Sequence, residues 1–160
     1  MKRYFPYFSI LLFLCCSHPS NRPEKGKLRD LPSFKILSID SSTYLTSESM
    51  SWNQAGIFMY FDPNCEHCIK QTNAFINSLN KLKNVEIYWI TNESISAARS
   101  FSRTYHLDGI SNAFVGKDLS YSFYNAYLPS DIPFIAIYNK KKELIRIYKG
   151  ETDINLIICQ

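Results

Sequence analysis

Short apolar runs mark the candidate β-strands of this chain. They are rich in Ile, Val, Phe and Tyr and are bounded by polar residues typical of turns. The predicted strands cover residues 34–39, 44–45, 57–61, 85–90, 113–115, 134–138 and 144–148. The run at 57–61 is apolar throughout, which is typical of a central strand covered on both faces. A polar turn at 139–142 makes the last two strands a predicted hairpin.

Apolar residues at helical spacing mark candidate helices between these strands. The spacing predicts a helix from Cys65 that ends near residues 80–84, a second over 94–106 and a short one over 119–127. Asp153 or Thr152 is expected to cap a last short helix that runs through Ile158. Because strands alternate with helices before a hairpin closes the chain, the pattern predicts an α/β fold with a sheet of mixed direction.

Length and composition allow one domain and exclude some functions. The chain has 160 residues, enough for a single core, and its 46% hydrophobic and 20% charged residues are ordinary for a globular protein. The formal charge of +4 includes Lys2 and Arg3, which lie in a candidate leader. Without them the charge is about +2, too weak to indicate nucleic-acid binding.

The first 16 residues have the pattern of an export signal. Met1, Lys2 and Arg3 precede an apolar run over 4–14, which is too short for a lasting membrane span and ends at Cys15 and Cys16. This ending resembles a bacterial lipobox, and the preference for a small preceding residue favours Cys16 over Cys15 as the lipid attachment site. A plain signal peptide that happens to contain cysteines is the alternative.

The leader sets the expected domain organisation and location. Residues 1–16 are interpreted as a lipoprotein signal peptide, 17–30 as a flexible polar tether with Pro and Gly, and 31–160 as the folded domain. No acidic run follows Cys16. We therefore expect a membrane-anchored lipoprotein in the periplasm of a Gram-negative bacterium, where disulfides persist.

Cys65 and Cys68 form a Cys-x-x-Cys pair between a predicted strand and a predicted helix. This placement is typical of a site that makes and breaks disulfides. A zinc site normally needs a second pair of ligands at metal spacing, and the sequence offers none. A purely structural use of the pair remains the other alternative. Cys159 near the C-terminus is expected to be a small packed residue.

Three features in this order resemble the thioredoxin superfamily, and in particular the TlpA/ResA-like redoxins of bacterial envelopes, including the lipoproteins of Bacteroidota. They are the strand, Cys65-Glu66-His67-Cys68 and helix; the segment Asp131-Ile132-Pro133-Phe134 before a late strand; and the closing hairpin and helix. The resemblance covers residues 31–160. It implies a three-layer sandwich in which helices flank a mixed central sheet. It also implies a cis peptide bond before Pro133, opposite the cysteines.

The resemblance and the helix start assign roles to the site residues. A helix N-terminus favours negative charge, so Cys65 is predicted to be the nucleophile and Cys68, one turn later, the resolving thiol. The backbone of Ile132, beside Pro133, is predicted to pair with an extended substrate. His67, if protonated, would make the disulfide more oxidising, and Glu66 would oppose it; both are alternatively solvated first-turn side chains.

Two positions depart from the pattern of the resembled families. A buried carboxylate is expected six residues before the first cysteine in thioredoxins and six residues after it in ResA-like proteins, but Met59 and Gln71 occupy these positions. Such a carboxylate relays the proton of the resolving thiol. Asp62, Glu86 or water are left as candidates for that role.

The sequence therefore predicts a thiol–disulfide oxidoreductase with no cofactor beyond its own disulfide. Its partners would be client proteins with thiols or disulfides and a membrane electron donor or acceptor. The TlpA/ResA resemblance favours the reducing direction. The alternatives are a disulfide-introducing oxidant, favoured by His67, and a non-catalytic binding module with a static bridge, favoured by Met59 and Gln71. A peroxidase is disfavoured because Phe58 and Asp62 replace the residues that a peroxiredoxin expects.

Overall fold

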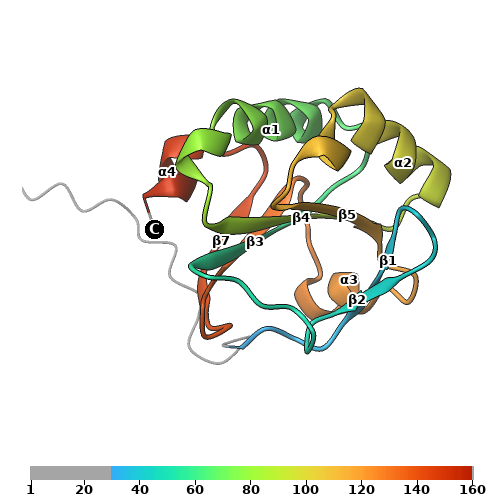
Figure 1. Ribbon diagram of the computed structural model, residues 1–160, viewed down its shortest axis with the longest axis horizontal. Coiled ribbons are helices and arrows are strands. Elements are labelled where there is room, and N and C mark those ends of the chain that lie inside the picture. Colours follow the sequence, from blue (N-terminus) through green and yellow to red (C-terminus); the bar gives the residue numbers. More distant parts are fainter. Residues whose placement is uncertain (1–29, 160) are drawn as a thin grey trace, which may run out of the picture.

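The computed structural model describes residues 30–159, which contain a seven-stranded mixed sheet and four α-helices (Figure 1). The strands are β1 (Lys35–Ser38), β2 (Tyr44–Thr46), β3 (Ala55–Tyr60), β4 (Val85–Thr91), β5 (Ala113–Lys117), β6 (Phe134–Asn139) and β7 (Leu144–Lys149). The helices are α1 (Glu66–Asn77), α2 (Ile95–Thr104), α3 (Ser122–Tyr127) and α4 (Ile154–Ile158), with 3₁₀ turns η1 (Leu79–Lys81) and η2 (Leu107–Gly109).

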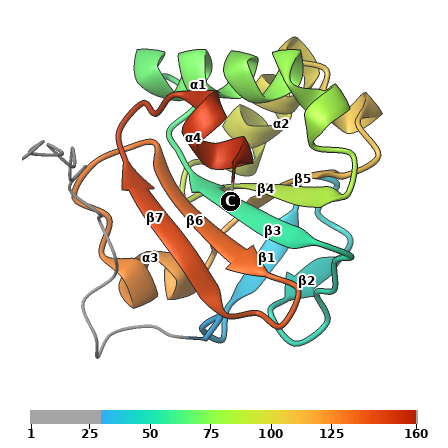
Figure 2. The same ribbon diagram turned by 90° about the vertical axis from the view of Figure 1, so that its left-hand side faces the viewer.

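The sheet has the strand order β2-β1-β5-β4-β3-β6-β7. Its centre is parallel, since β4 pairs in parallel with both β3 and β5, whereas β6 pairs antiparallel with β3 and with β7. Helices α1, α2 and α4 cover one face and α3 covers the other (Figure 1). Figure 2 shows α4 beside α1 on their common face, above the hairpin of β6 and β7. The predicted three-layer arrangement and mixed sheet are confirmed.

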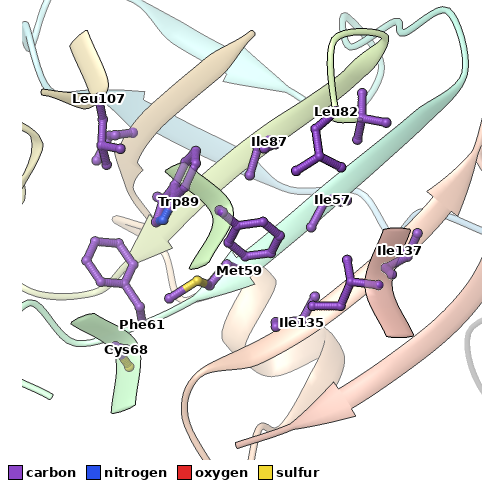
Figure 3. Packing of buried hydrophobic residues seen from close by; sticks show 14 of the residues in the cluster. Ile57, Met59, Phe61, Cys68, Leu82, Ile87, Trp89, Leu107, Ile135 and Ile137 are labelled. Atoms are coloured by element: carbon purple, nitrogen blue, oxygen red, sulfur yellow. The ribbon is translucent and has the colours of Figure 1, made fainter. Parts of the chain in front are cut away.

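Strand β3 divides the core into two because its side chains alternate between the faces of the sheet. Ile57 and Met59 pack under α1 and α2 with Trp89 of β4, and Figure 3 shows this cluster with Cys68 at its edge. Phe58 and Tyr60 point to the opposite face, into an aromatic cluster that α3 closes with Phe123. Both faces of β3 are thus buried, as its apolar sequence predicts.

Helix α1 is shorter than the apolar spacing predicts. It ends at Asn77, with Ser78 as its C-cap, and the chain continues through the 3₁₀ turn η1. Leu82 is nevertheless buried in the core cluster under α1. The apolar residues beyond Asn77 are therefore spaced as they are because the chain there is buried, although it is no longer α-helical.

The end of the chain follows the predicted pattern closely. Gly150 ends β7 with a positive φ of 76°. Asp153 is the N-cap of α4, where its Oδ1 accepts a hydrogen bond from the backbone N–H of Asn155 at 2.9 Å. Cys159, by contrast, is exposed, so the expectation of a packed residue was wrong. The short helix buries Ile157, and Cys159, its C-cap, lies off that buried side.

The predicted leader, the lipid site at Cys16 and nearly all of the predicted tether lie outside the described residues. The last tether residue, Asp30, forms an isolated antiparallel bridge with Glu143, and the next residue, Leu31, donates its N–H to the carbonyl of Lys142 at 2.9 Å. None of the helices between residues 30 and 159 is long and apolar enough to cross a membrane.

Candidate active site at the start of α1

The loop that joins β3 to α1 fixes the position of Cys65. Phe61 continues the pairing of β3, since its N–H donates to the carbonyl of Ile90 at 2.9 Å. Asp62 then organises the turn: its Oδ1 accepts from the N–H of Asn64 at 2.8 Å and its carbonyl accepts from the N–H of Cys65 at 3.1 Å. The turn places Cys65 immediately before the first residue of α1, Glu66.

Cys65 is the N-cap of α1 and is half-buried. Its Sγ accepts a hydrogen bond from the backbone N–H of Cys68 at 3.3 Å. This is the bond that a capping serine or aspartate side chain makes at other helices. Unpaired N–H groups and the helix dipole favour negative charge at this point, so the position suits a thiolate.

Cys68 lies one turn further along α1 and is fully buried, with none of its surface exposed. Burial raises the pKa of the Cys68 thiol well above its ordinary value, and the hydrogen bond to Cys65 raises it further; hydrogen bonding from the Asp62 backbone offsets part of this. Both cysteines are free thiols in the structure. The pair thus consists of a half-buried cysteine and a fully buried one.

Ile132 and Pro133 lie at the same end of the sheet as the cysteines. Phe134 pairs in register with Tyr60, so Pro133 lies beside the residues that lead from β3 to Cys65. The bond between Ile132 and Pro133 is cis, as the resemblance implies. Within residues 30–159, the backbone N–H and C=O of Ile132 make no hydrogen bond. An extended chain could therefore pair with them.

The two residues between the cysteines face different partners. Glu66 pairs with Lys70 across 2.8 Å, and this hydrogen bond and charge lower the pKa of Glu66. His67 points away from α1 to the loop after β7, where its Nδ1 lies 2.9 Å from Oε2 of Glu151. Both predicted tuning residues are exposed, and each has an ion-pair partner of its own.

Gln71 connects the site helix to the same loop. It is fully buried, and its Oε1 accepts a hydrogen bond from the backbone N–H of Thr152 at 2.8 Å. In the sequence, Gln71 stands out only as a missing carboxylate and Thr152 only as a possible cap of the last helix, and no signal selects Glu151. Nothing local in the sequence marks these contacts, because they join residues 81 and 84 positions apart.

The positions of Asp62 and Glu86 show which of these carboxylates could relay the proton of Cys68. Met59 is buried in the same apolar cluster as Cys68 and offers no titratable group (Figure 3). Glu86 pairs in register with Gly56, at the opposite end of β3 from the cysteines, so it is wrongly placed for the role. The carboxylate of Asp62 is close enough for its charge to contribute to the raised pKa of Cys68. Of the two carboxylates considered, only Asp62 is suitably placed.

An open groove of about 820 Å³ lies between α1, the Ile132 segment and the loop after β7. Its lining is His67 and Ala74 of α1, Asp131 and Ile132, and residues 149–154. The described residues contain no group of three or more His, Cys, Asp or Glu side chains that could hold a metal ion.

Solved structures with the same fold are numerous but distant in sequence. A candidate thioredoxin from Neisseria meningitidis is 18% identical, with a TM-score of 0.67, 82% of this chain covered and 86% of that chain. A candidate protein disulfide isomerase from Bacteroides thetaiotaomicron is 14% identical (TM-score 0.68, coverage 84% and 86%). A secreted Mycobacterium tuberculosis disulfide oxidoreductase, described as homologous to Escherichia coli DsbE, is 16% identical (TM-score 0.62, coverage 77% and 90%).

These similarities establish a thioredoxin-like α/β fold for residues 30–159. At such low sequence identity they establish the fold alone, and the chemistry has to be inferred from the residues of the site. No protein-family model and no curated protein matches the sequence.

Proposed function

We propose that this protein is a thiol–disulfide oxidoreductase. The observation that carries the proposal is the pairing of a half-buried Cys65 at the N-cap of α1 with a fully buried Cys68, whose backbone N–H donates to the Cys65 sulfur. One thiol can react with a client while the other is withheld from solvent. Structures described as a thioredoxin candidate and as a disulfide oxidoreductase share the fold, which supports this chemistry.

In the reducing direction the reaction has two exchanges. The Cys65 thiolate attacks one sulfur of a client disulfide, the client S–S bond breaks, and one client thiolate leaves as a mixed disulfide forms at Cys65. Cys68 then loses its proton and attacks the Cys65 sulfur, which releases the second client thiolate and closes the bridge between Cys65 and Cys68. Two electrons pass from the cysteines to the client, and a thiol donor restores the dithiol.

The buried Cys68 needs a base for the second exchange, because burial holds its pKa high. Asp62 is the carboxylate best placed to take the proton, directly or through water. The unpaired backbone of Ile132 would hold the client segment in extended form beside Cys65 while both steps occur.

The reducing direction, the lipid anchor at Cys16 and the periplasmic location are parts of the proposal that rest on the sequence. The electron donor would be a membrane thiol protein, as the TlpA/ResA resemblance implies. The position of His67 also supports this direction, since a histidine paired with Glu151 contributes less positive charge to the Cys65 thiolate than a free one.

The test is a trapping experiment in the native envelope. Cys68→Ser removes the resolving thiol, so mixed disulfides should accumulate on Cys65 and appear on non-reducing gels and in mass spectra. Cys65→Ser and the double variant are the matched controls and should trap nothing. The wild type should reduce insulin disulfides. If no partner is trapped and no insulin is reduced, the oxidoreductase proposal fails and a non-catalytic binding module is left.

A further inference from the structure

The loop that follows β7 places one carboxylate against the active-site helix. Glu151 Oε2 lies 2.9 Å from His67 Nδ1, although the two residues are 84 positions apart. The side chains are 43% and 63% exposed, so the pair is accessible to solvent but not detached from the protein. We propose that Glu151 is a positioning residue. It holds the His67 imidazole away from the Cys65 sulfur, and the redox couple formed by the two cysteines is therefore more reducing than it would be without Glu151.

The backbone around Glu151 is fixed on both sides. The N–H of Gly150 donates to the carbonyl of Pro133 at 2.9 Å, and the N–H of Thr152 donates to Oε1 of the buried Gln71 at 2.8 Å. Thr152 also donates its hydroxyl to the Gly150 carbonyl at 3.1 Å. The backbone of Glu151 is therefore held on a short bridge between the Pro133 segment and α1, and it does not move with the His67 ring.

The groove shows where the ring is held. Its lining, drawn from the described residues, includes His67 and Glu151 but neither Cys65 nor Cys68. His67 is nevertheless only two residues after Cys65, in the first turn of α1. An imidazole released from Glu151 is free to adopt other rotamers, some of them nearer to the Cys65 sulfur.

The charge of the His67 imidazole affects the redox equilibrium of Cys65 and Cys68. A protonated imidazole near Cys65 stabilises the thiolate, which stabilises the dithiol state and makes the disulfide a stronger oxidant. Glu151 opposes this by neutralising the imidazolium and by fixing its direction. This inference rests on the proposed redox function and adds a regulator of the same site.

Other charges near His67 are already engaged or lie across the groove. Glu66 and Lys70 of α1 pair with each other, and Asp153 caps α4. The remaining charged groups that line the groove are Lys149 and Asp131. Asp131 accepts a hydrogen bond from Ser130 and, within the described residues, makes no hydrogen bond or ion pair with His67, so it provides a matched carboxylate as a control.

The test compares four full-length proteins at pH 6, where free histidine is largely protonated. They are the wild type, Glu151→Gln, His67→Gln and the double variant, and Asp131→Asn in the wild-type and His67→Gln backgrounds supplies two further control proteins. Each protein is equilibrated with glutathione buffers, which gives the equilibrium constant between its dithiol and disulfide forms. The alkylation rate of Cys65 is measured separately by peptide mass spectrometry. Glu151→Gln should shift the equilibrium toward the dithiol by about threefold and speed Cys65 alkylation by about the same factor, the size of an exposed charge interaction.

Introducing Glu151→Gln into the His67→Gln protein distinguishes positioning of the imidazole from simple removal of a negative charge. In the His67→Gln background, Glu151→Gln should give less than half of that effect. Asp131→Asn should give the same small shift with or without His67. Equal effects of Glu151→Gln in both backgrounds, or no effect on either readout, would overturn the proposal.

The two readouts also separate this inference from the proposed function. If the wild type forms no reversible disulfide, the oxidoreductase proposal fails. The alkylation rates would still report whether Glu151 restrains His67, because they need only a free Cys65 thiol.

Discussion

Gln71 and Thr152 join the active-site helix to the end of the hairpin: Oε1 of the buried Gln71 accepts the backbone N–H of Thr152 at 2.8 Å. Gln71 is the residue at which the ResA resemblance expects a proton-relaying carboxylate. In this chain it holds the loop that carries Glu151. The departure from the pattern of the resembled proteins therefore has a structural use: Gln71 ties α1 to the loop that lines the same groove as Ile132.

Replacing Gln71 by Met should destabilise the protein. Methionine has a similar volume but no comparable acceptor, so the partly buried Thr152 N–H would lose its partner, at a cost of about 1 kcal/mol. Urea unfolding at pH 7 measures the free energy. A Gln71→Met protein as stable as the wild type would show that the bond to Thr152 contributes no more than the unpartnered Nε2 of Gln71 costs, since the substitution removes both.

Gln71→Glu is the matched control, because a carboxyl can still accept the bond. Burial disfavours the charged form and raises a carboxyl pKa above its value in the unfolded chain. The folded state would then hold the proton longer than the unfolded state. The stability of Gln71→Glu relative to the wild type should therefore be highest near pH 4 and fall as the pH rises toward 7.

The two active-site thiols should differ in reactivity. Cys68 is fully buried and its pKa is raised by that burial, whereas Cys65 is partly accessible. At pH 8 Cys65 should be alkylated at least about tenfold faster than Cys68, since one unit of pKa alone changes the thiolate fraction tenfold. Peptide mapping by mass spectrometry separates these sites from the exposed Cys159. Equal rates would contradict the assignment of nucleophile and resolving thiol.

Tyr60 should make the protein sensitive to alkaline pH. Within the described residues its buried hydroxyl has no hydrogen-bond partner, and burial raises its pKa, with the charge of Asp118 adding to the effect. The folded state keeps the hydroxyl proton while the unfolded chain loses it near pH 10, so this contribution to stability is lost as the pH rises above 10.

Tyr60→Phe should therefore be neutral or slightly stabilising at pH 7 and should reduce the alkaline slope by up to about 1.4 kcal/mol per pH unit. Burial also raises the pKa of Tyr138, to about 12, so a slope should remain. Urea unfolding between pH 9 and 11 measures it. The half-exposed Tyr44 supplies the control, and a Tyr60→Phe slope equal to that of Tyr44→Phe would refute the assignment.

Three glycines should respond differently to alanine. A Cβ at Gly116 would lie 2.5 Å from Cγ2 of Ile36 and 2.7 Å from the carbonyl oxygen of Leu37, where the backbone cannot give way. Gly116→Ala should cost about 1–3 kcal/mol. Gly150→Ala meets no atom but has a positive φ of 76°, so it should cost about 1 kcal/mol.

Gly109 provides the control for both substitutions, since its Cβ would meet open space and no unfavourable φ. Gly109→Ala should leave the unfolding free energy within about 0.5 kcal/mol of the wild type or raise it slightly. Thermal unfolding compares the three variants. If Gly116→Ala were as mild as Gly109→Ala, the close packing of β1 on β5 would be incorrect.

Local sequence signals were sufficient for the framework of the fold. Alternating apolar runs located each strand, and β3 was identified as central because it is apolar on both faces. Turn and capping chemistry located Gly150 and Asp153. These features depend on neighbours in sequence, which is why a single chain reveals them.

Features that depend on contacts between residues far apart in the chain could not be predicted from the sequence. The spacing of Cys65 and Cys68 indicated a redox site, but nothing local indicated that Glu151 would meet His67 or that Gln71 would hold Thr152. The placement of Glu86 at the far end of the sheet follows only from the parallel register of β3 and β4. Similarly, Cys159 lies in an apolar stretch, yet the short α4 leaves it exposed.

A redox titration shows whether Cys65 and Cys68 form a reversible disulfide. The full chain is equilibrated with glutathione buffers of graded potential, quenched with acid, alkylated and mapped by mass spectrometry. We expect one two-electron transition, in which an intramolecular bridge between Cys65 and Cys68 is formed or lost, with a tenfold change in the ratio of disulfide to dithiol per about 30 mV. A pair that stays reduced, or stays bridged, across the whole range would contradict it.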